Sequence, residues 1–120
     1  MTNRQLAAFA AWAVTAAVGC TTEIRNDIDS TNSELTGPYT VRRVTEGRTY
    51  VADVCVASRS RNDLVASQII DQRLSHGHDA IIVNLYHGQD GNAERVTWTP
   101  DKGSQASSIP GDATVCRQVS

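Results

Sequence analysis

Apolar and polar positions divide the chain into three parts. Residues 6–18 are apolar or small except for Thr15, and residues 21–38 are mostly polar with three isolated aliphatic side chains. From Tyr39 onward, short runs rich in β-branched residues alternate with turn residues, and one stretch carries apolar residues at helical spacing. The pattern predicts one small domain at 39–120 behind a polar linker.

The domain is predicted to have an α+β fold: a small sheet of about five strands with one packed helix, in the order β-β-α-β-β-β. The helix is the clearest element. It is expected over 63–76, with an N-cap oxygen from Ser60 or Asn62 and a terminating glycine at Gly77. The expected strands are 39–44, 48–57, 80–86, 94–99 and 113–119, and residues 101–111 are expected to form a polar loop.

The order of the elements also predicts how the strands pair. Strands 39–44 and 48–57 are close enough to form a hairpin, and 48–57 is apolar on both faces, as expected of a central strand. The helix with its short links joins 48–57 to 80–86, which predicts a parallel pair. Strand 94–99 is then expected to return antiparallel to 80–86.

The N-terminal stretch predicts export. Arg4 is the only charged residue ahead of the apolar run, and a cationic head followed by 7–15 apolar residues is typical of a secretory signal. The run is shorter than the ~20 residues that a membrane-spanning helix requires, so a retained helical anchor is the least favoured alternative. The prediction is a signal peptide at 1–19.

The end of this segment carries a family resemblance. Ala17-Val18-Gly19-Cys20 resembles the lipobox of bacterial lipoproteins, although that family most often has Leu where this chain has Ala17. The resemblance implies that Cys20 becomes the mature N-terminus and carries a diacylglycerol thioether. Thr21, in place of Asp, implies sorting to the outer membrane. The alternative is an ordinary signal cut after Gly19 or Ala17, which would release a soluble periplasmic or secreted protein.

The three cysteines, Cys20, Cys55 and Cys116, fit this interpretation. If Cys20 is lipidated, Cys55 and Cys116 remain as one pair in an oxidising compartment, where disulfides persist. A disulfide between them is therefore expected. The alternative is two buried free thiols, because Cys is often buried as a small apolar residue.

Residues 20–38 are predicted to form a flexible tether between Cys20 and the domain. Their composition offers too little apolar surface to offset the entropy of ordering the chain. Ile24, Ile28 and Leu35 lie at helical spacing, so a single partner-bound helix is the alternative.

Three clustered residues are candidate metal ligands: His76, His78 and Asp79, since imidazole and carboxylate groups bind borderline metals. The third histidine, His87, follows strand 80–86, and a strand of seven residues would separate it from the others by roughly 20 Å. This separation argues against a metal site, and histidines in polar loops at a helix end are the simpler interpretation.

Arg59 and Arg61, at the expected start of the helix, are candidates for binding an anion such as phosphate or an acidic glycan. A solvated rim of charges is the alternative. Removal of Arg4 with the signal leaves ten basic against thirteen acidic side chains, a mildly acidic balance that predicts no nucleic-acid partner. No motif predicts a cofactor or a catalytic nucleophile.

These observations together predict a lipid-anchored protein of the bacterial envelope that acts as a non-enzymatic interaction module. Its expected contacts are the membrane, through Cys20, and a protein or cell-wall partner. Accessory, exclusion and immunity lipoproteins have this size and layout, an analogy rather than an inference from residues. The alternative is a small envelope enzyme, or a ligand- or metal-binding protein, that uses His76 and His78 or Arg59 and Arg61.

Overall fold

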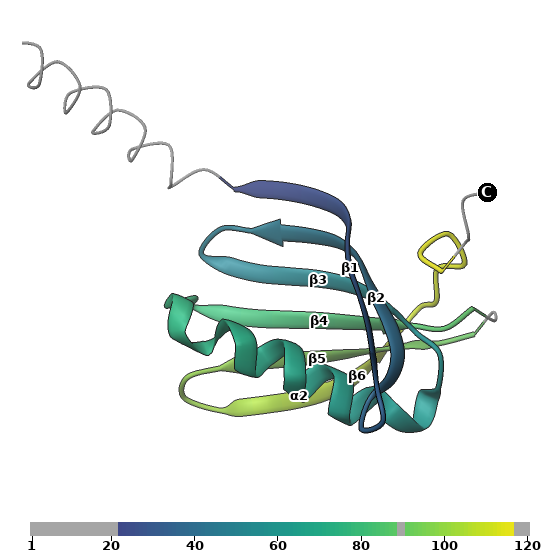
Figure 1. Cartoon of the computed structure of the whole chain (residues 1–120). Helices are drawn as coiled ribbons and strands as arrows, with labels where there is room; N and C mark the ends of the chain where they lie inside the picture. The colour runs from purple at the N-terminus through teal and green to yellow at the C-terminus, as the bar shows by residue number, and fades with distance from the viewer. Residues whose placement is uncertain (1–21, 89–90, 117–120) are drawn as a thin grey trace, which may run out of the picture.

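A computed structural model describes residues 22–88 and 91–116 and contains one sheet with a single α-helix on one of its faces (Figure 1). Within the described residues the sheet has six strands in the order β1-β2-β3-β4-β5-β6. Among these six described strands, only β3 and β4 are parallel to each other, and all other neighbours are antiparallel. The strands are β1 (Glu23–Ser33), β2 (Gly37–Glu46), β3 (Thr49–Val56), β4 (Ala80–Tyr86), β5 (Ala93–Thr99) and β6 (Gly103–Ile109).

The α+β class is confirmed, with six strands instead of about five. Four predicted strands are present as β2, β3, β4 and β5, and their pairing follows the prediction. The β2–β3 hairpin forms, β5 returns antiparallel to β4, and β3 runs parallel to β4 from Thr49↔Ala80 to Cys55↔Tyr86. The central position of β3 was predicted correctly because both of its faces are largely apolar.

Strand β1 corrects the prediction of a flexible tether over 20–38. It pairs with β2 from Glu23↔Glu46 to Ser33↔Gly37, so the sheet includes residues well before Tyr39. In the connecting turn the backbone N–H of Thr36 donates to Ser33 Oγ at 3.1 Å, and Gly37 has φ +70°, a conformation that favours glycine. β1 buries little apolar surface, so its backbone pairing, and not its hydrophobic pattern, makes it a strand.

The C-terminal part corrects two further predictions. Residues 103–109, expected to lie in a polar loop, form the edge strand β6, which pairs with β5 through Ala93↔Ile109 to Thr99↔Gly103. Residues 113–116, expected to begin a closing strand, form a turn, and 117–120 lie outside the described residues. The sequence of β6, GSQASSI, has no apolar alternation, and its partner β5 supplies the hydrogen bonds that order it.

The helix α2 (Asn62–Arg73) follows a 3₁₀ turn, η2 (Arg59–Arg61), and leads into a second one, η3 (Leu74–His76). Gly77 has φ +76° and ends the helical segment, as predicted. Leu74, the first residue of η3, is 44% exposed. In the described residues no helix is long and apolar enough to cross a membrane.

The core lies between α2 and the face of the sheet that it covers (Figure 1). Successive side chains of a strand point to opposite faces, so one alternate set from each central strand enters this core. β4 contributes three fully buried side chains, Ile81, Val83 and Leu85. The buried core residues are Tyr39, Val41, Val44, Tyr50, Ala52, Val54, Val56, Val65, Ala66, Ile69, Ile70, Ile81, Val83, Leu85 and Val96.

A disulfide joins Cys55 and Cys116, as predicted, with their Cα atoms 5.1 Å apart. Cys55 alternates with the buried Val54 and Val56, so the bond lies on the face of the sheet opposite α2. The C-terminal segment also lies against the β4–β5 connection. A Cβ atom on Gly111 would collide with the carbonyl oxygen of Gly91, so glycine is required there.

We expect Leu85→Ala to lower the free energy of unfolding by about 2–5 kcal/mol, because a fully buried side chain would leave a cavity. Leu74→Ala is the matched control: its side chain is 44% exposed, and the change should stay within about 0.5 kcal/mol. Urea unfolding followed by circular dichroism measures both. Equal effects of the two substitutions would contradict the core described above.

We expect the double variant Cys55→Ala/Cys116→Ala to lose roughly 2–4 kcal/mol of unfolding free energy, because it releases a cross-link between residues 61 positions apart. Reductant should move the wild-type unfolding midpoint towards that of the variant and leave the variant unchanged. A wild-type midpoint that does not respond to complete reduction would show that the cross-link contributes nothing.

Candidate functional site

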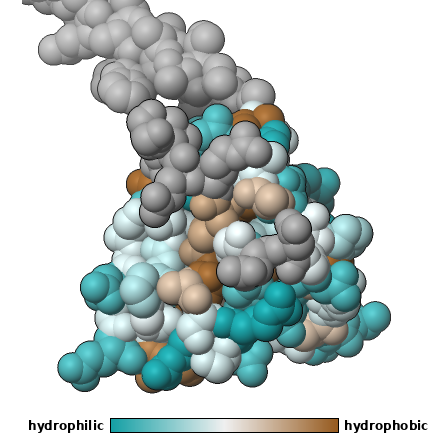
Figure 2. Space-filling model, turned by 90° about the vertical axis from the view of Figure 1, so that its right-hand side faces the viewer, coloured by the Kyte–Doolittle hydropathy of each residue, from teal (hydrophilic) through white to brown (hydrophobic). Residues whose placement is uncertain are grey.

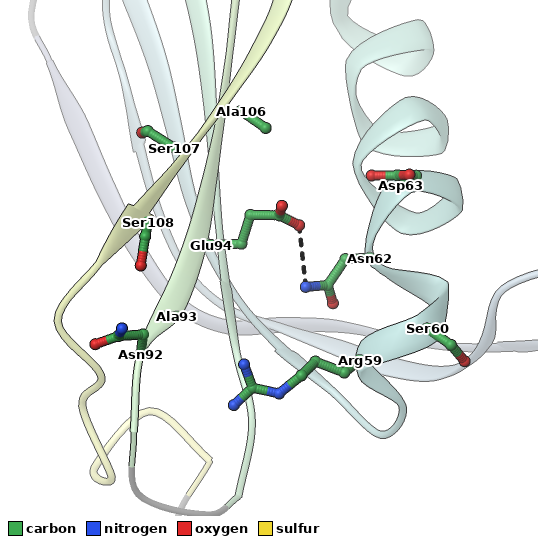
Figure 3. Close-up of a pocket in the computed structure, with 10 residues that line it drawn as sticks. All are labelled: Arg59, Ser60, Asn62, Asp63, Asn92, Ala93, Glu94, Ala106, Ser107 and Ser108. Atoms are coloured by element: carbon green, nitrogen blue, oxygen red, sulfur yellow. Dashed lines mark hydrogen bonds between the residues drawn. The ribbon is translucent and has the colours of Figure 1, made fainter.

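A groove runs between α2 and the outer strands β5 and β6 (Figure 3). The helix packs mainly on β4, and the side chains that β6 directs to the same face are small: Ser104, Ala106 and Ser108. Space therefore remains beside the helix. Its larger part has a volume of about 680 Å³ and is lined by Arg59, Ser60, Asn62, Asp63, Asn92, Ala93, Glu94, Ala106, Ser107 and Ser108.

A smaller cavity of about 220 Å³ continues the groove along the helix. Asp63 and Ala106 line both parts, so the two are continuous. On the helix side, the lining of this smaller part includes the apolar residues Ala66 and Ile70. Its lining residues are Asp63, Ala66, Ser67, Ile70, Val96, Ser104, Gln105 and Ala106.

Three side chains form a hydrogen-bonded chain at the N-terminal end of α2. His87 Nε2 lies 3.0 Å from Asn62 Oδ1, and Asn62 Nδ2 donates to Glu94 Oε1 at 3.1 Å (Figure 3). Asn62 is only 7% exposed, so both of its amide atoms are used within the protein. The prediction that Asn62 caps the helix is wrong: its side chain bridges β5 and the end of β4 instead, and Ser60 bonds to Ser58.

The protonation of His87 follows from this chain. Asn62 Oδ1 can only accept a hydrogen bond, so Nε2 carries the proton of a neutral imidazole. Burial lowers the pKa of His87, the nearby Arg59 guanidinium lowers it further, and Glu94 acts in the opposite direction. Nδ1 is buried without a hydrogen-bond partner among the described residues. His87 is therefore neutral at pH 7.

The two arginines proposed as an anion site do not converge. Arg59 lines the groove and points towards the β5 side of it (Figure 3), whereas Arg61 donates from Nη1 to the carbonyl oxygen of Leu35 at 3.1 Å. Arg59 also shares the groove with two carboxylates, Asp63 and Glu94. The groove is thus mixed in charge and slightly acidic.

The candidate metal ligands are engaged with other groups. His78 Nδ1 donates to the carbonyl oxygen of Gly47 at 3.0 Å, and Asp79 pairs with Arg48 at 2.9 Å. His76 stacks on His78 with ring centroids 6.1 Å apart. Throughout residues 22–88 and 91–116, no three His, Cys, Asp or Glu side chains are grouped to hold a metal ion.

A charged cluster around Glu46 was not predicted. Arg25 from β1 and Arg73 from α2 pair with its carboxylate, and His78 Nε2 lies 3.3 Å from Oε2. Arg73 also lies over the ring of Tyr50, 4.5 Å from its centroid. These residues are far apart in sequence, so no local motif could reveal the cluster. It connects β1 and α2 to the hairpin β2–β3.

The face of the sheet opposite α2 carries a second polar network. Asn84 Nδ2 donates to Asp53 Oδ1 at 3.0 Å, and Arg95 Nε donates to Asn84 Oδ1 at 2.7 Å. These three residues are direct cross-strand neighbours on β3, β4 and β5. Burial raises the pKa of the nearby Tyr86, with Asp53 and Asp112 adding to the effect and Arg95 opposing it.

Comparison with known protein families, curated proteins and solved structures finds no significant match. The function must therefore be argued from the chain itself. The groove combines an apolar wall, hydrogen-bonding side chains and both signs of charge. These are properties of a binding surface.

We expect the wild-type protein to lose more stability than His87→Gln between pH 7.5 and pH 5. The folded-state pKa of His87 is lowered, so below the unfolded-state value of 6.5 the unfolded chain binds a proton that the folded chain does not. Stability is present above that pH and is lost as the pH falls towards the folded-state pKa.

Thermal unfolding at the two pH values measures this difference in stability. The contributions of the other titrating groups are the same in both proteins and cancel in the comparison. Ser108→Ala is the control, because it changes the groove wall and leaves the hydrogen-bonded chain intact; it should keep the wild-type pH dependence. If the stability of His87→Gln depends on pH as strongly as that of the wild type, folding does not lower the pKa of His87.

Proposed function

We propose that the protein is a lipid-anchored component of a bacterial envelope and acts there as a non-enzymatic interaction module. The observation that carries the proposal is the Cys55–Cys116 disulfide. With these two residues bonded, Cys20 is the one cysteine left over in the sequence. It directly follows the apolar run that resembles a signal peptide, where a lipoprotein carries its lipid.

The disulfide also supports export. Such bonds persist in oxidising compartments such as the bacterial periplasm and are rare in the cytosol. Aromatic residues make up only 5% of the whole sequence, and a small domain gains much from a cross-link. Thr21 supports the outer membrane as the destination, and a periplasmic or secreted soluble protein is the alternative.

Strand β1 changes how the anchored domain would be presented. It begins at Glu23, three positions after Cys20, so the sheet would lie close to the membrane surface and not at the end of a long tether. Ile24, near the start of this strand, and Ile28, at its middle, are 57% and 41% exposed. We propose that this end of β1 faces the lipid headgroups.

An interaction module needs accessible surface of suitable chemistry. Figure 2, which views the molecule from the right of Figure 1, shows mainly hydrophilic and neutral residues with small apolar areas between them. Such a surface suits reversible, specific contacts better than permanent burial in an oligomer. The groove beside α2 is a concave surface lined by polar and apolar residues, and it supports binding of a partner there.

A second candidate function, a small-ligand-binding protein, is favoured by one observation. Arg59, already a candidate from the sequence, lines a groove whose volume of about 680 Å³ lies within the usual range for ligand pockets. In this alternative, a small molecule binds in the groove in place of a partner protein.

We expect the intact mass of the protein extracted from membranes to correspond to a chain that starts at Cys20 and carries added acyl groups. After reduction, alkylation should modify Cys55 and Cys116 only, because the Cys20 sulfur is already substituted. Without reduction, no cysteine should react. Mass spectrometry with and without reductant makes both measurements.

Cys20→Ser is the matched control, and it should abolish the acyl mass without reducing the thermal stability of the domain. Two results would contradict the proposal. One is a mature chain that retains Met1 with three reactive thiols. The other is an unmodified chain cut after Gly19 or Ala17 and recovered in the soluble fraction, which would establish the soluble alternative.

A further inference from the structure

The two edges of the sheet differ in how they are protected against pairing with another strand. β1 carries Glu23, Arg25 and Asp29, and its register shifts between Asn26 and Asp29. Charges and bulges are the usual devices that prevent edge-to-edge pairing. The sequence of β6 (Gly103–Ile109) contains no charged residue and no proline, and its pairing with β5 has no register shift. β6 is thus an open edge, the last strand of the sheet in the described residues.

We propose that β6 receives an extended peptide segment of a partner protein, apolar in alternate positions and basic at its N-terminal end. The segment adds antiparallel to β6 as a further strand. This inference rests on the proposed function as an interaction module and specifies the chemistry of its partner. Strand addition to an exposed sheet edge is a common mode of peptide recognition, in which backbone hydrogen bonds provide affinity and side-chain pockets provide specificity.

The groove provides the side-chain pockets. The residues of β6 that face α2 are Ser104, Ala106 and Ser108, so the edge strand itself does not fill the space beside the helix. On the helix side, Ala66 and Ile70 form an apolar wall. Alternate residues of an added strand point to the same face about 7 Å apart, and apolar side chains at these positions would enter the groove.

Charge sets the direction of the peptide. Asp63 and Glu94 lie at the end of the groove near Ser108, opposed by the single cation Arg59. A strand antiparallel to β6 places its N-terminal end at Ser108. A lysine, an arginine or a free amino group there would meet Asp63 and Glu94.

The side chains of β6 argue against a second copy of this chain as the occupant. Antiparallel pairing of two β6 strands about a two-fold axis places both α2 helices on one face of the joined sheet. The second β6 would present Ser104, Ala106 and Ser108 on this face, and these side chains are too small to fill the groove. A peptide with larger apolar side chains is therefore the better match for this edge.

The test is selection of a phage-displayed library of random dodecapeptides on the purified full-length chain in detergent micelles. We expect enriched sequences with alternating apolar residues and lysine or arginine near the N-terminal end. Synthetic copies of these peptides should bind the wild-type protein and lose at least tenfold in affinity to Ala106→Phe, which fills the groove from the edge strand. Asp63→Lys should weaken the basic peptides and leave copies with uncharged N-terminal ends unaffected.

Ser30→Phe is the matched control, a small-to-large change on the opposite edge strand β1, and it should bind as the wild type does. Circular dichroism of each variant verifies that it is folded; Ala106 is exposed, so the substitution alters the surface and not the core. These measurements do not depend on the lipid anchor, so their failure is distinguishable from failure of the proposed envelope location.

Three outcomes would overturn the proposal. The first is a selection that enriches no common pattern, and the second is a set of enriched peptides that bind Ala106→Phe as tightly as the wild type. The third is a wild-type dimer in sedimentation that Ala106→Phe dissociates, which would make a second copy the occupant of β6.

Discussion

Burial of one face of α2 against the sheet, mainly against the parallel strand β4, is the contact around which the fold is built. Parallel strands need a crossover, and the helix supplies it while covering the apolar side of the sheet. Val65 and Ile69 from the helix and Ile81, Val83 and Leu85 from β4 are almost entirely buried. Every other strand joins this βαβ unit by an antiparallel connection to its sequence neighbour.

The outer parts are held by polar and covalent interactions, because they bring little apolar surface. The carboxylate of Glu46 forms ion pairs with both Arg25 and Arg73. These pairs connect the edge strand β1 and the end of the helix to the end of β2. The disulfide from Cys55 holds the C-terminal segment on the opposite face. The domain therefore combines a small aliphatic core with local anchors at its periphery.

The same placement of the helix creates the groove. α2 lies over β4 and β5, and the last strand, β6, extends beyond it with small side chains on the helix side. The start of the helix then lies beside the start of β5, so Asn62 can connect Glu94 with His87. A concave surface and an open sheet edge therefore meet at one place.

Local sequence signals were enough to predict the helix and the four strands around it, because apolar spacing and turn residues act over short distances and the core has strong aliphatic patterns. The cysteine count favoured the pairing of Cys55 with Cys116, on the condition that Cys20 is lipidated. Residues 23–33 and 103–109 could not be recognised as strands from their sequence, because these polar segments are ordered by hydrogen bonds to a neighbouring strand. Only the tertiary structure decided that Arg59 and Arg61 diverge, because the contacts that orient each side chain come from distant parts of the chain.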